Sequence, residues 1–199
     1  MADSRYTKYT IPIMNDSDQK SFEKLFDVFY SRLFLFANSF LSNEMLAKEV
    51  VMDVFVKLWE RRDQLDRIDN LETYLYVTVR NNTYNYLRTE KNKKFDLLED
   101  VHIDVAKYEY TPETKYISQE EVEKINAAIE ELPPKCKMVF KLIREEGLKR
   151  NEVAKVLDIS VKTVDNQVAT AVKKIAETLN IDLSAKDRYI NLQSFLLSL

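Results

Sequence analysis

The chain has 199 residues, of which 45% are hydrophobic and 32% are charged, and its formal net charge is −3. This length fits one medium domain or two small ones. Gly147 is the only glycine, whereas a phosphate-binding loop needs several glycines close together so that backbone amides can approach the phosphates. Walker loops and dinucleotide-binding loops are therefore excluded. The scarcity of glycine also favours helices over β-hairpins.

Cys136 and His102 are each the only residue of their kind. A disulfide or a Cys/His zinc site within one chain is therefore excluded. A Ser-His-Asp triad would have to use His102, which lies in an acidic stretch without a strand-turn-helix pattern. We expect neither a cofactor nor a metal, and no enzyme activity.

The sequence contains no apolar run that approaches the ~20 residues needed to span a bilayer. Residues 1–15 lack the basic head and apolar stretch of a signal peptide. We therefore expect a cytoplasmic protein that does not insert into the membrane.

Basic and acidic residues are unevenly distributed along the chain, and this distribution is more informative than the net charge. Residues 80–94 contain five basic residues and one acidic residue, and residues 141–174 contain eight basic and five acidic residues. Between them, residues 95–131 contain three basic and eleven acidic residues. A uniformly acidic enzyme has no reason to separate its charges in this way, although a charge run alone is usually just a solvated face.

In chain order, residues 1–18 form an N-terminal segment and residues 21–41 are predicted to form the first helix. Its apolar side chains recur at three- and four-residue steps. They are Phe22, Leu25, Phe26, Phe29, Leu33, Phe36, Ala37 and Phe40. Ser21 is the expected N-cap, and Ser42-Asn43 ends the run.

A second helix is predicted over residues 45–62, a polar loop over 63–70 and a third helix over 71–88, with Leu71, Leu75, Val79 and Tyr86 near one face. In the second helix the inward residues are Leu46, Val50, Val54, Phe55 and Leu58. Trp59 stands beside Leu58 at the end of a helix, and we interpret it as a core residue rather than as a platform for stacking a base.

Periodicity is lost after this third helix, and residues 89–118 carry Pro112 and many acids. A structureless stretch longer than ~12–15 residues is uncommon inside a compact domain, so a boundary is expected here. The predicted organisation is a domain over residues 19–92, an acidic linker over 93–118, a second domain over 119–181 and a tail over 182–199.

The second domain is predicted to contain four helices. The first begins at Gln119 and is stopped by Pro133-Pro134. The second covers residues 135–146 and is followed by Gly147, where a left-handed residue is expected. A short helix over residues 150–157 and a longer one from Ser160 to about Leu179 complete the domain. The predicted fold class is all-α, with two small helical domains joined by the acidic linker.

Residues 151–175 have the pattern of a helix-turn-helix, in which the first helix braces a second helix that enters the major groove. Val164, Val168 and Val172 would be buried, and the exposed positions include amides and lysines. Amides can read adenine edges and lysines can hold phosphates. The candidate DNA-binding residues of this helix are Lys162, Thr163, Asp165, Asn166, Gln167, Thr170 and Lys173. Helical hairpins with a polar face also occur without DNA binding.

The stretch from Leu132 to Ile175, LPPKCKMVFKLIREEGLKRNEVAKVLDISVKTVDNQVATAVKKI, resembles the C-terminal DNA-binding region of sigma factors of the sigma-70 family. The resemblance implies that this region reads the promoter −35 element and rests on the β flap of RNA polymerase. Two departures are visible. Asp158 stands where glycine is common, and Lys149 stands where a Ser or Thr cap is expected, which costs roughly 1 kcal/mol.

A second resemblance covers AKEVVMDVFVKLWERRDQL (Ala47 to Leu65) and NLETYLYVTVRNNTYNYLR (Asn70 to Arg88). Both stretches are similar to the core-binding and −10-reading region of the same family, whose exposed second helix docks on the β′ clamp helices of polymerase. The residues that map to this face are Glu49, Met52, Asp53 and Lys57. Glutamine is usual at Met52, so apolar packing is expected there in place of a polar contact.

The same resemblance gives the third helix and the loop before it a role in opening the −10 element. A base that is unstacked from a duplex, at a cost of a few kcal/mol, must be held by donors, acceptors and flat surfaces. The candidate residues are Asp66, Arg67, Asp69, Asn70, Arg80, Asn81, Asn82, Tyr84, Asn85 and Arg88. An exposed polar helix beside a solvated loop is the alternative.

The two matching regions without a middle domain resemble the extracytoplasmic-function (ECF) group of the family. The implied function is a transcription initiation factor that binds polymerase core and promoter DNA, with an anti-sigma factor as a further partner. A helix-turn-helix regulator with an N-terminal helical sensing domain and a protein adaptor are the alternatives. The tail is expected to form a short amphipathic helix that either packs on the second domain or latches the two domains together.

Overall fold

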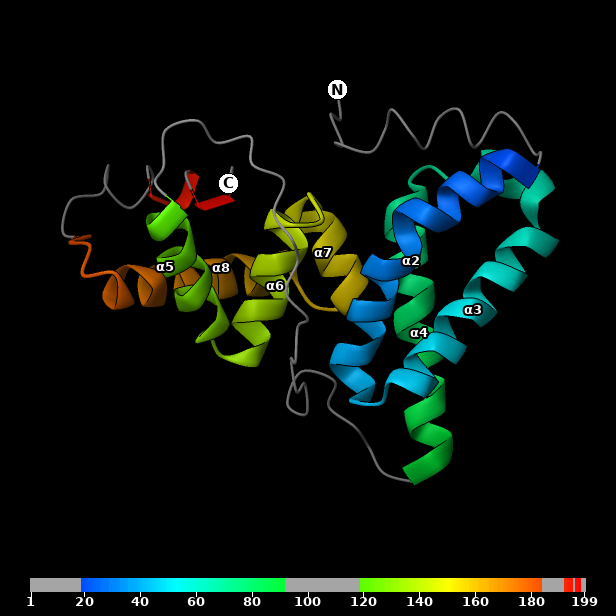
Figure 1. Cartoon of the computed structure of the whole chain (residues 1–199), viewed down its shortest axis with the longest axis horizontal. Helices are drawn as coiled ribbons and strands as arrows, with labels where there is room; N and C mark the ends of the chain where they lie inside the picture. The colour runs from blue at the N-terminus through cyan, green and yellow to red at the C-terminus, as the bar shows by residue number, and fades with distance from the viewer. Residues whose placement is uncertain (1–18, 92–118, 184–191, 195, 198–199) are drawn as a thin grey trace. The chain divides into compact units, whose positions relative to one another are not determined.

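The computed structural model describes residues 19–91, 119–183, 192–194 and 196–197. The N-terminal segment and the acidic linker lie outside the described residues. Within these ranges every regular element is a helix (Figure 1), which confirms the all-α fold class. They divide into two compact units. The first contains α2, α3, η1 and α4, and the second contains α5, α6, α8 and most of α7.

The first unit is built from three helices that all pack against one another: α2 (Gln19–Leu41), α3 (Glu44–Glu60) and α4 (Leu71–Lys91). The predicted apolar stripe of α2 is buried except at Phe22 and Phe26, which are half-buried. Asn43 caps α3, because its Oδ1 accepts hydrogen bonds from the backbone N–H groups of Met45 (3.1 Å) and Leu46 (3.2 Å).

Three local predictions for this unit are wrong. Ser21 is not an N-cap, since α2 begins at Gln19 and Ser21 is buried inside the first turns. The Gln19 side chain donates to Glu23 (2.9 Å) across one turn, which favours the earlier start. Most of the predicted loop over residues 63–70 is a 3-10 helix, η1 (Arg62–Arg67).

The inner face of α4 also differs from the prediction. The buried row continues from Val79 to Thr83 and Leu87 in steps of four, and Tyr86 beside it is only half-buried. A step of four residues keeps side chains on one face of a helix. Thr83 is therefore buried in this row, although its side chain is polar.

A buried ion pair joins α2 to α4. Arg32 Nη2 donates to Glu72 Oε1 over 2.7 Å, and both side chains are largely removed from solvent. The Arg32 guanidinium also lies 5.0 Å from the centroid of the Phe29 ring. Removing one partner of such a pair leaves the other charge buried, which is strongly destabilising, so this contact fixes α4 against α2.

The second unit contains α5 (Gln119–Glu130), α6 (Pro134–Arg144), α7 (Arg150–Leu157) and α8 (Val161–Thr178), with α5 and α6 both packed on α8. Gly147 and Asp158 both adopt the left-handed conformation, with φ of 68° and 58°. The missing Ser or Thr cap of α7 is compensated, because the Glu152 carboxylate accepts a hydrogen bond from the Lys149 backbone N–H (2.7 Å).

Glu130 joins α5 to α6, since its two oxygens accept from Lys137 Nζ (3.2 Å) and Lys141 Nζ (2.6 Å). Burial alone would raise the pKa of Glu130, but the hydrogen bonds and charges of the two lysines outweigh it and lower that pKa overall. A carboxyl whose pKa is lowered on folding stabilises the folded state above its unfolded pKa, and this contribution is lost as pH falls through the folded pKa.

The described part of the tail, residues 192–194 and 196–197, is helical and belongs to the second unit. Leu196 is fully buried there. This burial agrees with the expected packing of the tail on the second domain. Among the helices that the structure describes, none has the length and hydropathy of a bilayer span.

We predict that Glu72→Leu destabilises the first unit by about 3 kcal/mol, because it leaves the Arg32 guanidinium buried without this carboxylate. Urea unfolding followed by Trp59 fluorescence measures the effect in this unit, since Trp59 is the only tryptophan. Lys48→Ala is the control. Its ion pair with Glu44 (3.6 Å) is exposed, so a loss of only about 0.5 kcal/mol is expected. Equal losses for the two variants would contradict the prediction.

Candidate functional site

The N-terminal half of α8 is positioned by a cap and by a buried stripe. Ser160 Oγ accepts a hydrogen bond from the Thr163 backbone N–H (3.0 Å), so the helix starts directly after the turn at Asp158. Val164, Val168 and Val172 are buried. A helix has two sides, so burying this stripe turns the intervening polar residues outward.

The seven candidate residues on α8 differ in exposure. Those that are exposed are Lys162, Asp165, Asn166, Thr170 and Lys173, whereas Thr163 and Gln167 are half-buried. Two of the hydroxyls serve the helix itself: Thr163 Oγ1 contacts Ser160 Oγ (2.8 Å), and Thr170 Oγ1 donates to the Asn166 carbonyl (2.8 Å). The lysines and Asn166 are therefore the strongest candidates for outside contacts.

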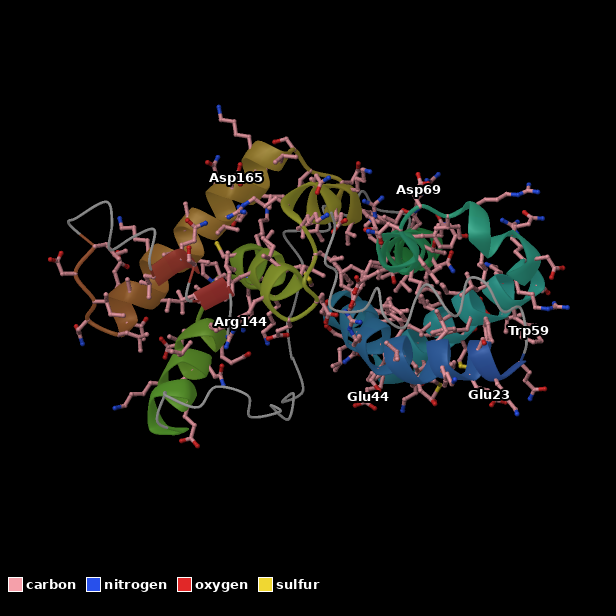
Figure 2. All side chains as sticks on the ribbon, turned by 90° about the horizontal axis from the view of Figure 1, so that it is seen from above. Glu23, Glu44, Trp59, Asp69, Arg144 and Asp165 are labelled. Carbon is pink, nitrogen blue, oxygen red and sulfur yellow. The ribbon has the colours of Figure 1, made fainter. Side chains whose placement is uncertain are left out.

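Asp165 would repel phosphates if it stood alone, but it is paired. Its Oδ1 lies 3.0 Å from Arg150 Nε at the start of α7. Figure 2 shows Asp165 on the outward side of α8. Sequence reasoning missed Arg150, because a pair separated by 15 residues in two different helices leaves no periodic signal. This partly exposed pair offsets the negative charge of Asp165 and links the start of α7 to α8.

The predicted −10 residues line α4 and the stretch before it. The exposed ones are Arg67, Asp69, Asn81, Asn85 and Arg88, and the half-buried ones are Asn70, Arg80, Asn82 and Tyr84. The side chain of Asp66 lies outside the described residues. Asn70 has a structural task as well, since its Oδ1 accepts from the Thr73 backbone N–H (2.9 Å) and caps α4.

Arg80, Asn81 and Tyr84 form a small polar cluster on α4. Arg80 Nη2 and Nε donate to Asn81 Oδ1 over 2.8 and 3.2 Å. The Arg80 guanidinium lies 5.8 Å from the centroid of the Tyr84 ring. A cation held near an aromatic face offers both a phosphate contact and a stacking surface, as binding of a single strand requires.

The outward side of α3 carries the four residues predicted to contact polymerase, and Glu49, Asp53 and Lys57 are all exposed there. Met52 is 44% exposed, and the structure adds Met45 at 77% and Val56 at 53%. Positions 45, 52 and 56 are spaced by seven and four residues, so these side chains form one apolar stripe. The same spacing is visible in the sequence and could have revealed the stripe.

Trp59 lies at the edge of the core, as the packing interpretation expected, and it is half-buried. Its ring meets that of Phe22 edge-on at a centroid distance of 4.9 Å. The Arg62 guanidinium covers the ring at 4.6 Å. Trp59 therefore contributes to the packing of aromatic side chains between α2 and α3.

Two family models match the chain. Residues 25–93 match Sigma-70 region 2, and residues 123–175 match Sigma-70, region 4. The RNA polymerase sigma factor SigZ of Bacillus subtilis is 23% identical over 175 residues, which cover 87% of this chain and 96% of SigZ. The ECF RNA polymerase sigma-E factor of Escherichia coli is 27% identical over 130 residues, covering 62% of this chain and 68% of that protein.

Solved structures show the same fold. The sigma factor RpoE, in complex with the anti-sigma factor NepR from Bartonella quintana, has a TM-score of 0.51 and 21% identity over 82% of this chain and 99% of its own. CnrH in complex with the cytosolic domain of CnrY has a TM-score of 0.50 and 20% identity, over 88% of this chain and 97% of its own.

The matches agree with the geometry of both units. The region 2 match covers most of α2 and all of α3 and α4. The region 4 match covers all of α6 and α7 and most of α5 and α8, and so includes the helix-turn-helix of α7 and α8. The ECF designation is part of the name of two of these relatives, the E. coli sigma-E factor and the sigma factor SigW of Bacillus subtilis, which is 23% identical over 81% of this chain and 90% of its own. The chain therefore belongs to the sigma-70 family, and it is a transcription initiation factor of the extracytoplasmic-function group.

Proposed function

We propose that this sigma factor uses three exposed helix faces: α3 binds RNA polymerase core, α4 and the stretch before it hold the opened −10 element, and α8 reads the −35 element. The observation that carries the proposal is the chemical difference between these faces. The outward side of α3 has an apolar centre, whereas α4 and α8 expose amides and cations. Apolar centres with polar rims suit proteins, and cations with amides suit DNA.

On α3, the apolar stripe of Met45, Met52 and Val56 forms the centre of the polymerase contact. Glu49, Asp53 and Lys57 form its polar rim. Flexible methionine side chains adapt to an apolar partner surface, so the exchange of the usual glutamine for Met52 strengthens packing at the cost of a hydrogen bond. The partner surface proposed from the family resemblance is the pair of β′ clamp helices.

On α8, Lys162 and Lys173 contact phosphates and fix the register of the helix on DNA, while Asn166 reads a base edge. The partly exposed pair of Arg150 and Asp165 reduces the repulsion between Asp165 and the phosphates during this contact. In this proposal the second unit rests on the β flap of polymerase, as the family resemblance implies. A regulator with an N-terminal sensing domain is not favoured, because residues 25–93 match Sigma-70 region 2.

Strand opening is proposed to proceed by binding alone, without a covalent step. Unstacking a base costs a few kcal/mol, and contacts that exist only with the open strand offset this cost. The cluster of Arg80 and Tyr84 offers a cation and a ring, and Asn82 and Asn85 offer amides. The released −10 strand is thereby held against reannealing.

We also propose an anti-sigma factor as a partner of this chain. The structural neighbour RpoE was solved with the anti-sigma factor NepR. An anti-sigma factor that covers the apolar stripe of α3 would compete directly with polymerase core. Transcription with purified core and fragmented genomic DNA tests the proposed function as a whole. Discrete start sites that depend on this chain are expected, and their absence would contradict it.

We predict that the double variant Met52→Asp/Val56→Asp raises the Kd for polymerase core at least about tenfold, because two charges would be desolvated at the centre of the interface. Both side chains are exposed, so folding of the free protein should be preserved. The matched control is Ile181→Asp, an exposed apolar residue after α8, with an unchanged Kd. A double variant that binds core within twofold of the parent would remove α3 from the contact.

We predict opposite defects for two asparagine variants. Asn166→Ala should weaken holoenzyme binding that depends on the −35 sequence by about 1 kcal/mol or more, and leave strand opening intact once promoter is saturated. Asn85→Ala should leave docking nearly unchanged and reduce permanganate reactivity of −10 thymines. Each variant is the control for the other. Equal permanganate reactivity of Asn85→Ala and the parent would refute the role of α4 in opening.

A further inference from the structure

The side chain of Gln167 on α8 is tied back to the core of its unit. Cys136 on α6 donates from Sγ to Gln167 Oε1 over 2.8 Å. Cys136 is buried, and α6 packs directly on α8. The neighbouring Asn166 is exposed, whereas Gln167 is half-buried. Of the two adjacent amides on the candidate DNA-reading face, Gln167 is therefore held by a hydrogen bond from α6.

This anchor has a direction. A carboxamide has an oxygen that only accepts and an NH₂ group that only donates. The thiol needs an acceptor, which Oε1 supplies, whereas the reversed amide would direct its N–H groups at sulfur, a weak acceptor. With Oε1 held by Cys136, the Nε2 end of Gln167 is the end left for an outside partner.

The thiol stays protonated at neutral pH, which keeps it a donor. Burial raises the pKa of Cys136 above its ordinary value, and the nearby charge of Lys174 opposes this without reversing it. The anchor is therefore present under the conditions in which a sigma factor works. Its strength depends on packing between α6 and α8 rather than on the DNA.

We propose that Cys136 is a positioning residue that makes Gln167 a pure donor toward DNA, so that Gln167 selects guanine in the −35 element. Guanine presents two acceptors, N7 and O6, side by side in the major groove, and one NH₂ group can donate to both. The two-ended contact with adenine expected from the sequence needs Oε1 on the DNA side. This inference rests on the proposed function, specifically on α8 reading the −35 element.

The test is a selection of bound promoters from a library randomised over the −35 element, using full-length protein with polymerase core. Gln167→Ala identifies the position that Gln167 reads as the one where base preference is lost. The parent should prefer guanine there. Cys136→Ala should reduce the preference for guanine over adenine about fivefold or more. Cys136→Ser, which keeps a small donor in place, should restore most of it, and other positions should be unchanged.

Two outcomes would overturn the inference. One is a base preference in Cys136→Ala that equals the parent's while Gln167→Ala alters it. The other is a parent preference for a base without adjacent acceptors. Failure of the proposed function is distinguishable from both, because neither Gln167→Ala nor Asn166→Ala would then alter preference at any −35 position. If Cys136→Ala unfolds, the comparison of Cys136→Ser with Cys136→Val decides between a donor role and a packing role.

Discussion

The burial of the valine stripe on α8 against its own unit is the constraint on which the proposed DNA-reading face of this helix depends. Val164, Val168 and Val172 occupy one side of the helix, so the polar residues between them must face outward. Hydrophobic burial thus determines which side chains of α8 can take part in the proposed reading of DNA. Any change that rotates α8, even by one residue, would exchange the residues offered to bases for those that belong to the core.

Buried polar contacts complement this non-directional force in both units. Apolar stripes tolerate small rotations and slips, whereas an ion pair such as Arg32 with Glu72 is satisfied in one register only. Between α5 and α6, the exposed Glu130 accepts from two lysines, of which Lys137 is buried. We infer that the buried pair of Arg32 and Glu72 serves uniqueness of packing more than net stability, because a buried pair recovers little beyond its own desolvation cost.

Periodicity predicted the helices well because each has a buried stripe, and α7 was predicted at its observed bounds, Arg150–Leu157. Helix ends were less predictable: Ser21 looks like a cap by residue type, yet α2 starts two residues earlier. Contacts between helices left no local trace in the sequence. The bond from Cys136 to Gln167 spans 31 positions, and Arg32 with Glu72 spans 40. Five of the seven candidate residues on α8 are exposed as predicted, whereas Thr163 and Gln167 are half-buried, and the roles of all of them stay predictions.

The same physical rules give the exposed faces of α3 and α8 opposite chemistry. A protein partner supplies apolar surface, so leaving Met45, Met52 and Val56 exposed in the free chain costs free energy that binding recovers. DNA supplies phosphates and base edges, so exposed lysines and amides stay solvated until it arrives. An apolar face therefore gains free energy from any apolar partner that covers it in the absence of polymerase, whereas a polar face is already stabilised by hydration. This asymmetry makes α3, rather than α8, the surface on which a competing protein would control the factor most effectively.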